Sequence, residues 1–266
     1  MRFHKMHGLG NDFVVIDARQ GAVAIDARLA RAIADRRTGV GCDQLILLEP
    51  SDAADLRMRI FNPDGGEVEA CGNAARCVTL LEGGAPTIQT RGGTISGRAN
   101  GAGASVDMGL PRFGWDEIPL AYPIDTAALP VGWEELQRPF AVNVGNPHIV
   151  FFVNRPVEAV KLDRLGPLIE NDPLFPERVN VNVAQIDGDA IRLRVWERGA
   201  GLTQACGTGA CATAVAAIAT RRAKSPVDVH LPGGALRIEW RRGEPIRMTG
   251  PAAHVFTGEI DLETLG

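Results

Sequence analysis

A short cysteine-containing pattern occurs twice in this 266-residue chain and constrains its fold more than any other feature. Residues 70–75 read ACGNAA, and residues 205–210 read ACGTGA. Two further pairs share the same offset of about half the chain: residues 57–61 with 192–196, and residues 10–11 with 145–146. Because three landmarks recur at one spacing, the sequence predicts two copies of one structural unit.

The repeat predicts two domains of similar size, each large enough for its own core. The segment 110–139 is rich in proline and tryptophan and loses periodicity, so the boundary is expected at its start. A closing strand at 254–262 is expected to return to the first domain. The predicted lobes are therefore residues 1–110 with 254–266, and residues 111–253.

Composition excludes several functional classes. The chain is 45% hydrophobic and 23% charged, with a net charge of −4. It lacks the basic stripe typical of nucleic-acid binding, and it has no apolar run of about 18 residues that would indicate a membrane span. The N-terminal residues MRFHKMH lack the apolar core of a signal peptide. These features predict a cytoplasmic protein with no nucleic-acid or membrane partner.

Hydrophobic periodicity indicates alternating strands and helices in both halves. Asp26 is placed to cap the first helix, and glycines follow the predicted helices in the first half. The expected strands are residues 3–6, 13–16, 44–48, 56–62, 140–143, 148–153, 178–186 and 191–196. The expected helices are residues 27–37, 73–81, 162–169 and 210–222. The predicted class is α/β.

The two repeated cysteines, Cys71 and Cys206, each precede a glycine where a helix is expected to begin. The free N–H groups and dipole of a helix start lower the pKa of a thiol. The same N–H groups can hold a carboxylate. A lone Cys-Gly pair is more often a buried structural cysteine, but two copies in matched context favour a functional role. Two such thiols would suit chemistry on both faces of one carbon.

The other three cysteines do not predict a metal site. Cys77 and Cys211 lie inside the expected helices and fit packing, and Cys42 receives no role. Five cysteines, an odd number, do not make a disulfide framework. Their spacing also differs from that of structural zinc ligands, and no nearby histidine completes a set. We predict no metal.

Several polar residues occupy turns from which they could contact a substrate. Any single asparagine in a turn is more often explained by turn geometry. Glu197 and Arg198 differ, because an adjacent Glu and Arg beside a glycine loop suit an amino group and a carboxylate. His148 could assist proton handling or pack within a strand. The turn residues considered with them are Asn11, Gln44, Asn62, Asn73, Asn146 and Asn180.

Over almost its whole length the chain resembles the diaminopimelate epimerase family. The resemblance rests on specific motifs in both halves. These motifs are residues 3–13 (FHKMHGLGNDF), 61–65 (FNPDG), 71–76 (CGNAAR), 145–148 (GNPH), 178–180 (RVN), 196–199 (WERG) and 205–212 (ACGTGACA).

The resemblance implies a cofactor-independent isomerase that interconverts LL- and meso-2,6-diaminopimelate. It implies that Cys71 and Cys206 are the acid/base thiols and that His148 and Glu197 lie near the reacting centre. It also implies two pseudo-symmetric domains, each a mixed barrel-like sheet around a central helix, and a homodimer. The substrate-binding residues that it implies are Asn11, Gln44, Asn62, Gly72, Asn73, Asn146, Asn180, Glu197, Arg198, Gly207 and Thr208.

The absence of a cofactor is also expected from the residues. Pyridoxal phosphate needs a Schiff-base lysine, and Lys5, Lys161 and Lys224 lie in no convincing site. Two alternatives remain open at this point. A two-thiol racemase acting on proline or hydroxyproline would follow the same logic, but its substrate lacks a second amino-acid end. A non-catalytic binding protein on a duplicated fold would not exchange the α-hydrogen of its ligand.

Overall fold

The structure is a computed structural model that describes residues 1–21, 23–68, 71–101 and 103–265. Ala70 of the first repeated motif therefore lies outside the described residues. The chain divides into two compact units, Met1–Asp107 with Thr249–Gly266, and Met108–Met248. The division falls a few residues before residue 110 because Met108 and Gly109 each form a backbone hydrogen bond with Ile246 of the second unit.

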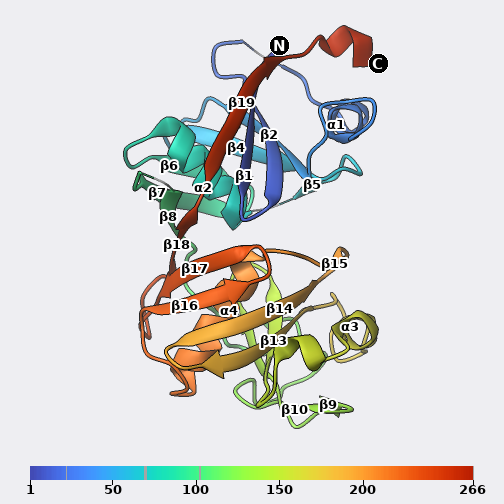
Figure 1. The fold of residues 1–266 in the computed structure, drawn as a ribbon, viewed down its shortest axis with the longest axis vertical. Coiled ribbons are helices and arrows are strands. Elements are labelled where there is room, and N and C mark those ends of the chain that lie inside the picture. The colour runs from blue at the N-terminus through green and yellow to red at the C-terminus, as the bar shows by residue number, and fades with distance from the viewer. Residues whose placement is uncertain (22, 69–70, 102, 266) are drawn as a thin grey trace. The chain divides into compact units, whose positions relative to one another are not determined.

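The first unit is a mixed sheet. Its strands are β1 (Arg2–Gly8), β2 (Asn11–Asp17), β3 (Gln44–Glu49), β4 (Leu56–Phe61), β5 (Glu67–Val68), β6 (Thr87–Thr90), β7 (Gly93–Ala99), β8 (Gly103–Asp107) and β19 (Ala253–Glu259). The β1–β2, β3–β4, β4–β5 and β6–β7 pairs are antiparallel, whereas β2–β3 and β4–β6 are parallel. The C-terminal strand β19 runs antiparallel alongside β1, as the expected closing strand requires (Figure 1).

The second unit repeats this pairing order. Its strands are β11 (Phe140–Asn143), β12 (Pro147–Phe152), β13 (Asn180–Asp187), β14 (Ala190–Glu197), β15 (Gly201–Leu202), β16 (Val227–Leu231) and β17 (Gly234–Glu239). The β11–β12, β13–β14, β14–β15 and β16–β17 pairs are antiparallel, and β12–β13 and β14–β16 are parallel. Six successive pairings thus agree in order and sense with those of the first unit.

Shorter elements complete the fold. A small hairpin joins β9 (Gly132–Trp133) to β10 (Leu136–Gln137) in the segment that lacked periodicity. Two 3₁₀ turns occur at Val157–Ala159 and Leu262–Leu265. Strand β18 (Arg247–Pro251) carries the chain from the second unit back to the first.

Each sheet lies between two helices. In the first unit, α1 (Ala27–Ala34) packs with Val14, Ile16, Leu45 and Leu47, and α2 (Gly72–Glu82) packs against other strands of the sheet, including β1 and β8. In the second unit, α3 (Leu162–Glu170) packs on β13 and β14, and α4 (Gly207–Ala219) contacts β11, β12 and β17 (Figure 1). The predicted fold class is confirmed.

The central helices of the two units, α2 and α4, are buried on nearly every side, unlike an amphipathic surface helix. Ten of the thirteen residues of α4 are buried, which explains its alanine-rich composition, because small side chains let the surrounding strands approach closely. Helix α4 begins at Gly207, before the predicted start at 210, because Cys206 itself occupies the N-cap position. Asp26 caps α1 as predicted, accepting a hydrogen bond from the Leu29 N–H at 2.8 Å.

Strand periodicity decides which polar side chains meet the central helix. Successive strand residues point to opposite faces. Val181 and Val183 of β13 join the core beneath α3, so Asn180 and Asn182 point to the face that carries α4. His148 pairs in register with Asn180 on the neighbouring strand β12 and shares this face.

Candidate active site

Cys71 occupies the N-cap of α2 in the first unit. Its backbone is extended, with φ −144° and ψ 114°, and its carbonyl accepts the Ala75 N–H at 2.9 Å. The Cys71 thiol is half-buried and donates to Asn11 Oδ1 over 3.9 Å. Cys71 therefore stands at the start of a helix, as the repeated motif predicted.

A chain of side-chain hydrogen bonds orients the residues around Cys71. Asn73 Nδ2 donates to Asn11 Oδ1 at 3.2 Å, and Asn11 Nδ2 donates to Asp43 Oδ2 at 3.0 Å. Asn73 Oδ1 accepts from the Arg76 guanidinium at 2.8 Å. Arg76 is fully buried within α2. We call Cys71, Asn11, Asn73 and Arg76 the Cys71 cluster.

Gln44 and Asn62 form a second polar pair in the first unit. Gln44 begins β3 and Asn62 follows β4, and Gln44 Nε2 donates to Asn62 Oδ1 at 2.9 Å. Gln44 Oε1 is buried and has no hydrogen-bond partner among the residues that the structure describes. An unsatisfied buried acceptor is costly, so this oxygen is suited to a donor brought by a ligand, such as an ammonium group.

Cys206 occupies the corresponding N-cap of α4 in the second unit. It is 3% exposed. Its sulfur accepts the Gly209 N–H at 3.3 Å and lies 3.5 Å from the Thr208 hydroxyl oxygen. We call Cys206, Thr208, Gly209 and the neighbouring Glu197 the Cys206 cluster.

The expectation that a helix start lowers the thiol pKa is wrong for Cys206. Burial and the neighbouring Glu197 carboxylate raise the pKa of Cys206 well above its ordinary value. The hydrogen bonds from Thr208 and Gly209 act in the opposite direction but have smaller effects. Desolvation therefore outweighs the helix start, and Cys206 holds its proton at neutral pH, which suits the role of an acid.

Three buried thiols make stability sensitive to alkaline pH. Burial raises the pKa of Cys42 to about 11 and that of Cys77 to about 12, and Cys206 shifts in the same direction. The pKa of a thiol in the unfolded chain is about 8.5. Because the folded state holds these protons more tightly, their contribution is fully present below pH about 8 and is lost as the pH rises through the folded pKa values.

We therefore expect the free energy of unfolding to fall between pH 8 and pH 10, by up to about 1.4 kcal/mol per thiol per pH unit. Urea unfolding under reducing conditions measures this. The Cys77→Ala variant should show a shallower fall. A free energy that is equal at both pH values in the wild type would contradict the prediction.

Glu197 and Arg198 stand at the end of β14 and are held by different partners. The Thr203 hydroxyl donates to Glu197 Oε1 at 2.5 Å. Burial raises the pKa of Glu197, against the opposing hydrogen bonds from Thr203 and Cys206. The Arg198 backbone N–H donates to Asn180 Oδ1 at 2.9 Å, and its guanidinium donates to the Glu177 carbonyl at 2.9 Å.

His148 is fully buried between two asparagines. Asn182 Nδ2 donates to His148 Nδ1 at 3.0 Å, so the proton is on Nε2, which donates to Asn146 Oδ1 at 2.8 Å. Burial lowers the pKa of His148 to about 3. The neutral His148 ring uses both nitrogens in hydrogen bonds and orients Asn146. This geometry favours a positioning role for His148 over proton transfer.

The structure thus connects predicted residues within each unit: Cys71, Asn11 and Asn73 form one cluster of the first unit, and Gln44 and Asn62 form a separate pair there. In the second unit, hydrogen bonds join Asn146 to His148 and Asn180 to Arg198. The sequence reasoning missed Asn182, Thr203, Asp43 and Arg76. Asn182 had a detectable signal, because polar residues at 180 and 182 alternate with valines along a buried strand. Arg76 and Asp43 had none, because the burial of Arg76 depends on the fold and Asp43 binds Asn11 of a distant segment.

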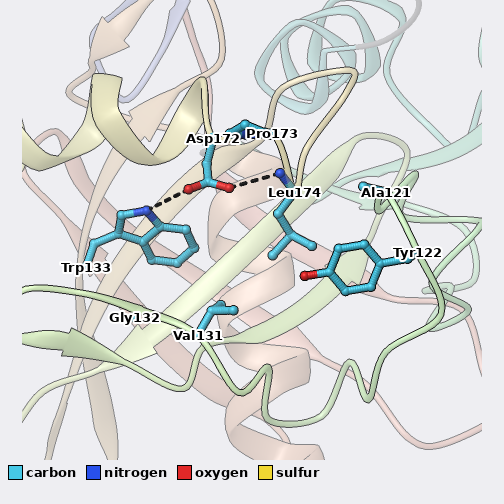
Figure 2. Close-up of a pocket in the computed structure, with 8 residues that line it drawn as sticks. All are labelled: Ala121, Tyr122, Val131, Gly132, Trp133, Asp172, Pro173 and Leu174. Atoms are coloured by element: carbon cyan, nitrogen blue, oxygen red, sulfur yellow. Dashed lines mark hydrogen bonds between the residues drawn. The ribbon is translucent and has the colours of Figure 1, made fainter.

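A separate hollow of about 560 Å³ lies on the second unit and contains none of the predicted site residues. Tyr122, Trp133 and Leu174 line it, and Asp172 accepts the Trp133 indole N–H at 3.0 Å and the Leu174 N–H at 2.9 Å (Figure 2). Within the described ranges, no three His, Cys, Asp or Glu side chains are grouped as a metal site requires. None of the helices in the described part of the chain is long and apolar enough to cross a membrane.

Comparison with known proteins identifies the family. The sequence model described as "Diaminopimelate epimerase" matches residues 3–114 and 140–255. The chain belongs to the diaminopimelate epimerase family. It is 67% identical to the diaminopimelate epimerase of Rhizorhabdus wittichii, over 100% of this chain and 97% of the relative. It is 64% identical to that of Sphingopyxis alaskensis, over 100% and 99%.

Solved structures share the fold of this diaminopimelate epimerase family member at low sequence identity. A probable proline racemase from Agrobacterium radiobacter matches with a TM-score of 0.72 and 16% identity, over 98% of this chain and 93% of that one. A hydroxyproline epimerase from Agrobacterium vitis matches with a TM-score of 0.69 and 16% identity, over 98% and 90%. These likenesses support the fold, whereas the close relatives support the family.

Proposed function

We propose that this chain interconverts LL- and meso-2,6-diaminopimelate by moving one α-proton between two cysteines, as an isomerase of lysine biosynthesis. Membership of the family carries the reaction. The observation that carries the mechanism is the matched placement of Cys71 and Cys206 at the N-caps of two buried, topologically equivalent helices. In one direction a thiolate removes the α-proton and the other thiol delivers a proton to the opposite face. The roles exchange in the reverse direction.

The two thiols differ in a way that suits this division of labour. Cys206 is buried beside Glu197, and burial raises the pKa of Cys206, so it rests as the proton donor. Cys71 is half-buried, and we assign it as the base in that state, once its thiol has released the proton that it donates to Asn11 Oδ1. When the proton has moved, Cys71 is the thiol and Cys206 the thiolate, and the enzyme is ready for the other isomer.

The α-proton of an amino acid is weakly acidic, so the developing negative charge must be stabilised without an electron sink. The N–H groups of Gly72 and Asn73, and those of Gly207 and Thr208, lie in the first turns of α2 and α4. Preorganised N–H groups in a site that excludes water stabilise such charge strongly. We assign these four residues to the reacting carboxylate, and we propose that no cofactor takes part.

The remaining polar residues suit the second amino-acid end of the substrate. Gln44, oriented by its hydrogen bond to Asn62, offers its unpartnered amide oxygen to an ammonium group, and the Arg198 guanidinium offers a charged fork for a carboxylate. Asn146 lies in the turn before β12 and accepts from His148. Asn180 donates to the Pro147 carbonyl and accepts the Arg198 backbone N–H. Proline and hydroxyproline have no second amino-acid end for these groups to bind.

The reaction can be tested directly. LL-2,6-diaminopimelate is incubated with the enzyme in deuterium oxide, and the products are separated on a chiral column and analysed by mass spectrometry. We expect meso product with one deuterium at the inverted carbon. Absence of α-exchange would contradict catalysis, and inversion of proline in place of diaminopimelate would contradict the assigned substrate.

Substitution Arg198→Ala is expected to raise KM about 100-fold or more, because charge-assisted hydrogen bonds to a carboxylate contribute about 1.5–3 kcal/mol each. Steady-state kinetics on LL-diaminopimelate measures this effect. Arg192→Ala is a matched control, since Arg192 lies on β14, which ends just before Arg198, but pairs with the exposed Asp187. An unchanged KM in Arg198→Ala would refute the assignment.

We also propose that the enzyme is a cytoplasmic homodimer. Catalytic thiols need a reducing compartment to remain reduced. In the first unit, Val255 and Phe256 of β19 are 56% and 48% exposed where the register with β1 shifts, and exposed apolar side chains suit burial by a second copy. Light scattering after size-exclusion chromatography reports the mass, and Phe256→Glu should shift it to that of a monomer.

A further inference from the structure

A buried carboxylate in the second unit lies where stability alone would not place it. Glu170 is the last residue of α3 and is 5% exposed. The carbonyl end of a helix carries partial negative charge, so an acidic residue there is unfavourable. Burial adds a desolvation cost unless hydrogen bonds compensate for it. The structure must therefore supply strong donors to Glu170.

The two closest donors flank the residues that the proposed function uses. Glu170 Oε2 accepts the Trp196 indole N–H at 2.7 Å, and Glu170 Oε1 accepts the Gly199 backbone N–H at 2.8 Å. Residues 196 and 199 stand on either side of the Glu197–Arg198 pair. We call residues 196–199 the Glu197 loop. One carboxylate thus holds both ends of this loop.

The loop has other restraints as well, because the Arg198 N–H donates to Asn180 Oδ1 and the Thr203 hydroxyl donates to Glu197 Oε1. Gly199 has a φ of +77°, so the chain turns sharply at the second donor. The Trp196 ring packs so closely on α3 that a Cβ added at Gly166 would lie 2.4 Å from it. Arg178 also approaches Glu170 Oε1, at 3.3 Å, but its side chain is 55% exposed, and such a pair contributes little.

We propose that Glu170 is a positioning residue for the reaction, which clamps the Glu197 loop so that Glu197 stays beside Cys206 and Arg198 faces the substrate. Among the described residues, the hydrogen bonds of Glu170 go to Arg178, Trp196 and Gly199, and not to the Cys206 sulfur or to the side chains of Glu197 and Arg198. Its action passes through Trp196 and Gly199. The proposal rests on the proposed function for its kinetic consequence, but not for its structural one.

The test replaces one carboxylate oxygen of Glu170 by the NH₂ group of an amide. In Glu170→Gln one of the two loop N–H groups faces an NH₂ group, so the clamp opens at one end. We expect kcat to fall and KM to rise, with kcat/KM reduced about 10- to 100-fold, as 1.4 to 2.7 kcal/mol of lost positioning would produce. Displacement of Glu197 from Cys206 should also raise the thiolate fraction of Cys206, so alkylation of Cys206 by iodoacetamide at pH 8.5 should accelerate about tenfold.

The chain offers a close control. Asp172→Asn changes a second carboxylate, which lies just beyond the end of α3. Like Glu170, Asp172 accepts an indole N–H and a backbone N–H, but its partners Trp133 and Leu174 line the separate hollow (Figure 2). This variant should leave kcat, KM and the alkylation rate of Cys206 within about twofold of wild type. If Glu170→Gln does not fold, Trp196→Phe removes one donor, keeps most of the ring and should change both readouts in the same direction.

The two readouts separate this proposal from the proposed function. Alkylation of Cys206, measured by peptide mass spectrometry, does not require turnover. If the wild type fails to exchange α-protons while Glu170→Gln still accelerates alkylation, the function is wrong and the clamp stands. If Glu170→Gln leaves Cys206 alkylation unchanged, or if Asp172→Asn alters it equally, the clamp is overturned.

Discussion

Cys71→Ala and Cys206→Ala are each expected to lower the rate of epimerisation at least about 1000-fold. A positioned acid or base contributes about 10²–10⁴-fold to a proton transfer, and inversion needs both partners. Each variant retains one of the two proposed catalytic thiols. We therefore expect each to exchange the α-hydrogen of only one stereoisomer for deuterium, without inversion, and the two variants to act on opposite isomers. Incubation of the LL and meso isomers in deuterium oxide with chiral analysis measures both effects.

The matched controls are Cys77→Ala in α2 and Cys211→Ala in α4. Both remove a fully buried thiol from the same two helices. These variants should lose some stability but keep kcat, because their sulfurs lie within the helices and not at their N-caps. Retained inversion in either Cys71→Ala or Cys206→Ala, or equal losses in all four variants, would refute the two-thiol mechanism.

Gly209→Ala is expected to damage both stability and catalysis. Alanine normally stabilises a helix by about 1 kcal/mol relative to glycine. Here an added Cβ would lie 2.8 Å from Asn182 Oδ1, 3.0 Å from Val195 Cγ2 and 3.2 Å from the Cys206 sulfur. Overpacking of this kind costs about 1–3 kcal/mol, so we expect a net loss of stability. Since the sulfur must move, kcat should fall about 10- to 100-fold.

Chemical unfolding and steady-state kinetics measure these two effects. Ala217→Gly is the control for stability, because it weakens α4 at a buried position two turns or more from Cys206. It should lower the free energy of unfolding by about 1 kcal/mol and leave kcat near the wild-type value. A Gly209→Ala variant as stable and active as wild type would show that the crowding around Cys206 is relieved without cost.

Much of the fold was predictable because local patterns specify it. Alternating residues in 56–62 and 191–196 gave β4 and β14, and Asp26 marked the start of α1. The equal spacing of the repeated motifs predicted two copies of one structural unit, and the structure then showed their common pairing order. The ends of α4 were less predictable, because a glycine-rich first turn reads as a loop until its packing is known.

The chemistry of the candidate site was only partly predictable. The residue types and their places in turns pointed to Cys71, Cys206, Glu197 and Arg198. The charge states did not follow from them. Cys206 keeps its proton and His148 is neutral because both are buried, and burial depends on strands and helices contributed by distant segments.

By itself the sequence determined the duplication, the order of strands and the position of a thiol before each central helix, since these follow from periodicity and from residue identity. Only the tertiary structure decided which groups are desolvated and which side chains hold others, as Glu170 holds the Glu197 loop and Asn11 holds Asn73. The physical reason is that desolvation and side-chain hydrogen bonding depend on distance in space, and the chain brings these partners together only when it folds.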